Sequence, residues 1–208
     1  MYALVESGSI TKYFNYPKGF TLGDLQYSGD IFTKWTANEL AAIGIYEVTF
    51  DNSNKKDEQW YINTNQTFTY DASAKTVTAT YGTATAKKHA DTNWTQKQID
   101  DGDAPEGADT DTVATRGLKY NLIQTLKQQA AGILQDTDWY IVRKADAGTA
   151  VPSAITTHRA AVRTKAAEME TAITNASDTS ALETLYTYTE QEDGSTTRPL
   201  GELPTLES

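Results

Sequence analysis

The stretch DTDWYIVRKADAGTAVPSAITTHRAAVRTKAAEMETAI, residues 136–173, decides the fold of the second half of the chain. Pro152 can open a helix, because a proline in the first turn loses no intrahelical hydrogen bond. After it, apolar residues recur at steps built from three and four, which places them on one stripe of a helix. They are Ile155, Val162, Ala166, Met169 and Ile173. The spacing predicts a helix from about Pro152 to just before Asn175.

A second apolar stripe precedes this stretch and predicts a long helix over 113–134. Its members are Leu118, Leu122, Leu126, Ala130, Ile133 and Leu134. Because a helix with one narrow stripe gains most of its stability from packing, we expect the two helices to form an antiparallel pair. Residues 139–142 are expected to cross between them. A third, short helix is predicted over 178–188.

The first half of the chain has the composition and alternation of β-strands. Residues 76–81 alternate threonine with apolar side chains, as in a half-buried antiparallel strand. Further strands are predicted over 2–5, 10–14, 45–50, 59–62 and 67–70. Thr36 and Glu39 have the spacing of a capping box for a short helix over 37–43, which Gly44 would close.

These elements predict an α+β fold in which a small N-terminal antiparallel β-rich domain is followed by a C-terminal helical hairpin module. The β-rich domain covers 1–90 and the helical module 117–190. Between them, 91–116 is acidic and contains glycine and proline, which favours an exposed linker. The polar tail, 191–208, is expected to be extended.

Composition excludes several functional classes. The net charge of −10 argues against a nucleic-acid partner, since phosphate binding requires clustered basic residues. The absence of cysteine excludes disulfides, thiolate zinc sites and cysteine nucleophiles. The start, MYALVESGSITKYF, lacks the pattern of a signal peptide, and no run of residues is apolar enough for a membrane span, so we expect no membrane insertion.

Both ends of the chain resemble one family. The order Asp138-Trp139-Tyr140, then Val151-Pro152, then His158-Arg159-Ala160-Ala161-Val162-Arg163 is similar to the C-terminal module of phage tail-fibre and tail assembly chaperone proteins. The opening is similar to the same group. Its matching segments are Met1-Tyr2-Ala3-Leu4-Val5, Leu22-Gly23-Asp24-Leu25, Glu39-Leu40-Ala41-Ala42 and Gly44-Ile45-Tyr46-Glu47-Val48. The middle of the chain is not covered.

The resemblance implies a non-enzymatic bacteriophage tail protein that binds tail-fibre or baseplate subunits. Such a protein is either a virion tail component or a fibre assembly chaperone, located in the virion tail or in the host cytoplasm during phage assembly. A homo-oligomer is compatible with both roles. We expect the partner-binding residues to be Trp139, Tyr140, Arg159 and Arg163.

Each of these residues also has an intramolecular interpretation. Arg159 and Arg163 lie one helical turn apart and would either bind a partner's carboxylates or tie the helix to Asp136, Asp138 or Asp146; we favour the second. Trp139 and Tyr140 would form either an interface anchor or part of the core under the helix pair.

No catalytic residue, metal site or cofactor is expected. The acidic residues over 100–111 lack the spacing of a calcium-binding loop, so a solvated segment is favoured. His89 and His158 lie far apart in the sequence and are expected at the surface. Phosphate-binding, serine-elbow and zinc-protease motifs are all missing from the sequence.

Two other functional classes stay open. The first is a carbohydrate-binding module of a phage receptor-recognition apparatus, in which Trp35, Trp60 and Tyr61 of the N-terminal sheet would stack on sugars. The second is a hydrolase that would cleave cell-surface glycan with a pair of carboxylates.

Overall fold

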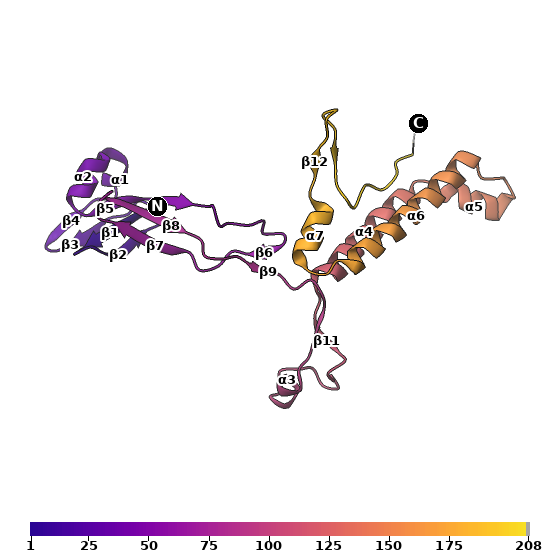
Figure 1. The fold of residues 1–208 in the computed structure, drawn as a ribbon, viewed down its shortest axis with the longest axis horizontal. Helices are drawn as coiled ribbons and strands as arrows, with labels where there is room; N and C mark the ends of the chain where they lie inside the picture. Colours follow the sequence, from indigo (N-terminus) through magenta and orange to yellow (C-terminus); the bar gives the residue numbers. More distant parts are fainter. Residues whose placement is uncertain (207–208) are drawn as a thin grey trace. The chain divides into compact units, whose positions relative to one another are not determined.

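The computed structural model describes residues 1–206 and has the predicted α+β fold, with strands in the first part of the chain and helices in the last (Figure 1). The chain divides into two compact units, Met1–Thr85 and Ala86–Ser208. This boundary precedes the predicted one, because 91–116 folds as part of the second unit.

The N-terminal unit is built on a five-stranded sheet. In the order in which they pair, its strands are β2 (Ser9–Phe14), β1 (Tyr2–Glu6), β5 (Ile45–Asp51), β8 (Thr76–Thr80) and β7 (Thr67–Asp71). The β5 and β8 strands are parallel, and the other pairs are antiparallel. The sheet is therefore mixed, whereas a purely antiparallel sheet was expected. Beyond it, β6 (Tyr61–Ile62) pairs with β9 (Thr85–Ala86).

The sheet curves until its two edge strands approach each other. The rings of Tyr13 on β2 and Phe68 on β7 lie 4.7 Å apart. On this face of the sheet, small buried side chains are surrounded by larger, partly buried ones such as Tyr46, Phe68 and Tyr70. Its buried residues are Ala3, Val48, Val77 and Ala79.

The other face of the sheet holds an aromatic core. It is covered by the hairpin of β3 (Phe20–Leu22) and β4 (Leu25–Tyr27) and by the helices α1 (Ile31–Lys34) and α2 (Ala37–Ala42). The core residues are Leu4, Phe14, Phe20, Ile31, Phe32, Leu40 and Ile45. The predicted capping box of α2 is confirmed, because Thr36 and Glu39 bond each other's backbone N–H groups.

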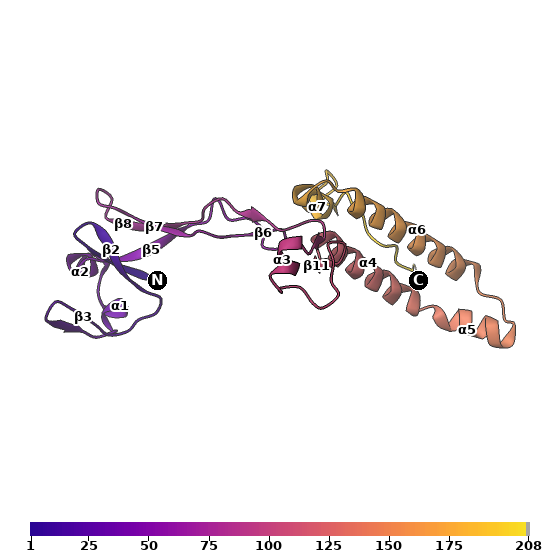
Figure 2. The ribbon, with the colours of Figure 1, turned by 90° about the horizontal axis from the view of Figure 1, so that it is seen from below.

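The second unit contains the predicted helix pair, but its first helix begins at Leu118 and not at residue 113, because Val113–Thr115 form a strand. The helices α4 (Leu118–Gln135) and α6 (Ser153–Asn175) lie side by side in both views (Figures 1 and 2). Leu126 and Ala130 of α4 are buried, as are Val162, Met169 and Ile173 of α6. The short helix predicted near the C-terminus is α7 (Thr179–Tyr186).

The prediction that residues 139–142 cross between the two long helices is wrong. These residues belong to a separate helix, α5 (Asp138–Ala147). Asp138 stands in its first turn, where a negative charge is favoured. Gly148 ends the helix in the left-handed conformation, with φ 71°.

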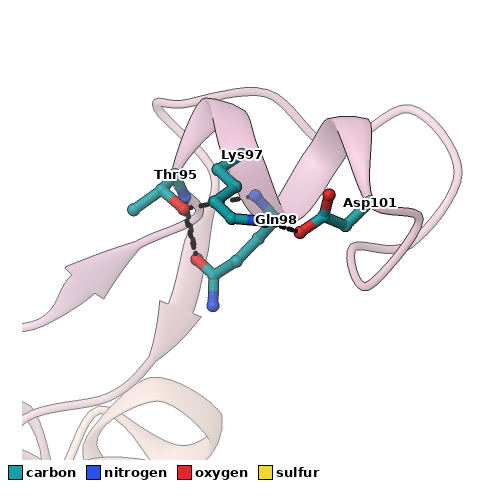
Figure 3. Close-up of polar contacts among 4 residues, drawn as sticks. All are labelled: Thr95, Lys97, Gln98 and Asp101. Atoms are coloured by element: carbon teal, nitrogen blue, oxygen red, sulfur yellow. Dashed lines mark hydrogen bonds and ion pairs between the residues drawn. The ribbon is translucent and has the colours of Figure 1, made fainter.

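The segment 91–116 is not a simple linker. It contains β10 (Thr92–Asn93), α3 (Gln96–Asp100) and β11 (Val113–Thr115), and β10 pairs with β11. Figure 3 shows how α3 is held: the backbone N–H of Thr95 donates to Gln98, the backbone N–H of Gln98 donates to Thr95, and Lys97 pairs with Asp101. Local capping therefore gives order to an acidic segment.

The tail is not simply extended either. The strands β12 (Thr189–Glu190) and β13 (Thr196–Thr197) form a hairpin, and the Leu200 side chain is buried. Its backbone N–H donates to the carbonyl of Leu185, 3.0 Å away. The predicted tail included residues 207–208, which lie outside the described residues. Over residues 1–206, no helix combines the length and apolar character that crossing a bilayer would need.

Candidate protein-binding surface on the helical unit

Helix α5 exposes its apolar residues to solvent. None of its residues is buried, and Trp139, Ile141 and Val142 are 57%, 42% and 64% exposed. A surface helix normally turns such residues toward a core. The exposed apolar side chains make this helix a candidate interaction surface. We call residues 139–143 the α5 patch.

Arg143 adds a cation to the aromatic part of the patch. Its guanidinium carbon lies 4.5 Å from the ring centroid of Trp139 and 5.4 Å from that of Tyr140. Its Nε is buried and has no hydrogen-bond partner within the described residues. The two rings therefore hold a guanidinium that no acid of the described chain neutralises.

Arg143 was absent from the predicted site, although the sequence contained a signal for it. It follows Trp139 by four residues, the spacing at which side chains meet on one face of a helix. That spacing applies only if 139–143 is helical, and a crossing segment was predicted there. The helical conformation of α5 is therefore what places Arg143 beside Trp139.

Arg159 lies inside the unit and not on its surface. Its buried guanidinium donates to the carbonyl of Leu134 at 2.6 Å and to the hydroxyl of Thr137 at 2.7 Å, and pairs with Asp138 at 2.8 Å. The intramolecular interpretation is confirmed, with Asp138 as the acid. Because Arg159 joins α6 to the end of α4 and the start of α5, it positions the patch and is not available to a partner.

Arg163 lies one turn further along α6 and is exposed. It lines a groove of about 300 Å³ between α4 and α6, together with Leu126, Lys127, Ala130, Ala131, Leu134, Ala166, Ala167 and Glu170. Its one hydrogen bond among the described residues is a long one, 3.4 Å, to the carbonyl of Arg159. Arg163 makes no described contact with Trp139 or Tyr140, so the structure gives an α5 patch and a neighbouring groove.

Other predicted surface residues are buried. His158 is buried because it falls on the same stripe as Ile155 and Val162, so its expected surface position is wrong. Trp60 and Tyr61 are also buried and cannot stack on a sugar in the way proposed for a carbohydrate-binding module. Trp35, the remaining candidate, is 37% exposed.

Among the acidic residues near α3, Asp109 accepts hydrogen bonds from residues of its own turn. Asp109 accepts hydrogen bonds from the hydroxyl of Thr112, at 2.7 Å, and from the backbone N–H of Asp111. These bonds, the first above all, hold the pKa of Asp109 below its usual range, since they favour the charged carboxylate. In the described part of the chain, acids and histidines do not gather in groups of three or more suited to a metal ion.

No protein-family model matches this chain, and neither a curated protein nor a solved structure matches it.

Proposed function

We propose that this chain is a non-enzymatic bacteriophage tail protein and that it binds a tail-fibre or baseplate subunit through the α5 patch. The observation that carries the proposal is the exposure of Trp139, Ile141 and Val142 on one ten-residue helix. Solvent contact of these side chains is unfavourable, and a partner that covers them gains the free energy of burying apolar surface.

The chemistry of the patch suits a protein partner. Tryptophan, tyrosine and arginine are the residues that most often dominate binding energy at protein interfaces. Arg143 is already stacked on two rings, so it loses little freedom when it pairs with a carboxylate. The expected partner surface is therefore an apolar hollow with an acidic residue at its edge.

The phage assignment is supported by the resemblance of residues 138–140, 151–152 and 158–163 to tail-fibre and tail assembly chaperone modules. The α5 patch includes the Trp139-Tyr140 pair of that motif. Two roles follow. In one, the chain stays in the finished tail; in the other, it holds the fibre during assembly and then leaves.

A quantitative mass-spectrometric inventory of purified phage particles tests the proposal. Particles are prepared from the parent phage and from phages that carry Trp139→Ala with Arg143→Ala, or Tyr16→Ala. Tyr16 is the matched control, because it is an exposed aromatic residue paired with the cation of Lys18 in the other unit.

We expect the double variant to lower the amount of fibre or baseplate subunit per particle, while Tyr16→Ala leaves it unchanged. The chain itself will be found in the particles if it is a tail component, and only in the lysate if it is a chaperone. Normal fibre and baseplate content in the double variant, with its circular dichroism unchanged, would refute the proposal.

A further inference from the structure

The N-terminal unit has a cavity of about 590 Å³ on the face of the sheet that the short helices partly cover. Its walls come from α2, from β5 and from the turn between β7 and β8. Buried Leu40 and Ile45 lie at its apolar side, and Trp35 lines it together with polar residues. This volume lies within the range of small-molecule sites in proteins.

Strand geometry places polar side chains along one wall. Glu47 and Thr49 lie on the same face of β5 as Ile45, because side chains alternate along a strand. The parallel register pairs Val48 with Val77, which puts Glu47 level with Thr76. Carboxylate and hydroxyl groups of neighbouring strands therefore line the cavity side by side.

The turn that carries Lys75 into the cavity is well defined. The carboxylate of Asp71 accepts the backbone N–H groups of Ser73 at 2.8 Å and Ala74 at 3.0 Å. These bonds hold the pKa of Asp71 below its usual range, the bond from Ala74 most of all. Lys75 then takes a left-handed conformation, with φ 54°, and lines the cavity beside Thr76.

Trp35 forms the aromatic wall. It follows α1 directly and precedes the cap of α2, and Tyr27 supports it edge to face with ring centroids 6.0 Å apart and planes at 89°. The indole is 37% exposed, and its N–H makes no hydrogen bond within residues 1–206. A ring held in this way offers a surface for stacking.

Three polar side chains of the lining are not used elsewhere, whereas the hydroxyls of Tyr2 and Tyr46 are hydrogen-bonded to Phe32 and Tyr70. The side chains of Asn38, Glu47 and Lys75 make no hydrogen bond or ion pair within the described residues. The carboxylate can accept, the ammonium can donate, and the amide can do both. Glu47 and Lys75 are the charged residues of the lining and have opposite signs, so the lining carries no net charge.

We infer that this cavity binds a neutral saccharide. A pyranose ring has an apolar face of C–H groups, which suits the indole of Trp35, and an edge of hydroxyl groups, which suits Asn38, Glu47 and Lys75. Because Glu47 and Lys75 balance each other, an acidic or a basic sugar would meet a like charge as well as an opposite one, which favours a sugar without charge. The site does not involve the α5 patch, so it goes beyond the proposed function and does not depend on it.

The test uses the full-length protein on an array of neutral, acidic and amino-sugar oligosaccharides, followed by calorimetric titration with the neutral oligosaccharide that gives the strongest signal. Trp35→Ala and Glu47→Gln alter the site. Tyr16→Ala removes an exposed aromatic residue outside it, and Trp139→Ala alters the α5 patch.

We expect binding to neutral glycans, an affinity at least about tenfold lower in Trp35→Ala, and a smaller loss in Glu47→Gln. Both controls should bind like the parent protein. If Trp35→Ala does not fold, the affinity of Glu47→Gln for the neutral oligosaccharide tests the inference alone. The inference is overturned if no glycan binds, if the acidic glycans bind best, or if neither site variant changes the affinity. Loss of fibre from particles with Trp139→Ala and Arg143→Ala tests the proposed function separately, and none of these glycan results alters it.

Discussion

Arg159 shows how one side chain fixes the geometry of the α5 patch. Its guanidinium joins the last turn of α4, the Thr137 hydroxyl and the first residue of α5, and it is buried while Asp138 remains half exposed. Hydrogen bonds to a charged group are worth more than neutral ones. The patch is therefore oriented by a residue that does not itself belong to the exposed surface.

Arg159→Ala should lower the free energy of unfolding of the helical unit by about 2–3 kcal/mol, because a buried carbonyl and a buried hydroxyl lose a charged donor. Arg163→Ala is the matched control: it removes the same side chain one turn away, from an exposed position, and should change stability by less than about 0.5 kcal/mol. Urea denaturation followed by circular dichroism measures both. Equal effects of the two variants would show that Arg159 has no special structural role.

Gly44 cannot carry a side chain for two reasons. Its φ is +78°, and a Cβ there would lie 2.5 Å from the carbonyl oxygen of Val5. Gly8 is the matched control in the same unit, because its φ is +80° but nothing lies within 4 Å of a Cβ. Gly8→Ala should cost about 1–2 kcal/mol from conformation alone, and Gly44→Ala clearly more. Thermal unfolding compares them, and equal melting temperatures would contradict the clash.

At the scale of residues, periodicity predicted part of the pattern of burial. Four members of the predicted stripe, Ile155, Val162, Met169 and Ile173, are buried as expected, whereas Ala166 is only partly buried; His158 falls on the same stripe. The burial of Trp60 and Tyr61 could not be predicted, because a short strand pattern does not indicate which parts of a chain will cover it. The cavity beside Trp35 forms where residues 74–76 and Tyr2 come against the nearby segments 35–41 and 45–49, and no local pattern predicts that meeting.

At the scale of elements, sequence predicted the long helices and failed where a local apolar run was ambiguous. Residues 139–142 are four consecutive apolar residues, which strands and helices both contain. The flanking residues favour a helix here, because Asp138 lies in its first turn and Gly148 ends it. In 91–116, acidic composition favoured a linker, whereas the pair Thr95 and Gln98 has the spacing of a capping box and indicated α3.

Asp91 anchors the segment 91–116 to the start of α4. It accepts the backbone N–H of Gly117 at 2.7 Å and pairs with Arg116 at 2.6 Å. The first of these and then the second hold the pKa of Asp91 below its ordinary value. For a carboxyl whose folded pKa is lowered, the stabilisation is fully present above the unfolded pKa, about 3.9, and is lost as pH falls through the folded pKa.

Asp91→Asn should therefore be less stable than the parent protein at pH 7, and the difference should shrink as pH falls from about 5 through the folded pKa. Urea denaturation at a series of pH values measures it. A difference in unfolding free energy that stays constant down to pH 2 would mean that the charge of Asp91 contributes nothing.

At the scale of the molecule, each of the two units has its own core, and each contains one of the two proposed binding sites. The N-terminal unit packs its aromatic core between a curved sheet and short helices, and the second unit packs α4 on α6. Because each unit encloses its own apolar cluster, residues 1–85 and 86–208 should each fold when expressed alone. Calorimetry should give a cooperative transition for each fragment. A fragment that melts without one would show that its core depends on the other unit.

Contact between α5 and a tail subunit can be detected by site-specific photo-crosslinking from position 142 in infected cells. Val142 is 64% exposed, so a photoreactive residue there disturbs no core. We expect one dominant adduct, with a tail-fibre or baseplate subunit, and none from the same photoreactive group at position 16. Binding through α5 is ruled out if position 142 gives no adduct with either kind of subunit, or if position 16 gives the same adduct.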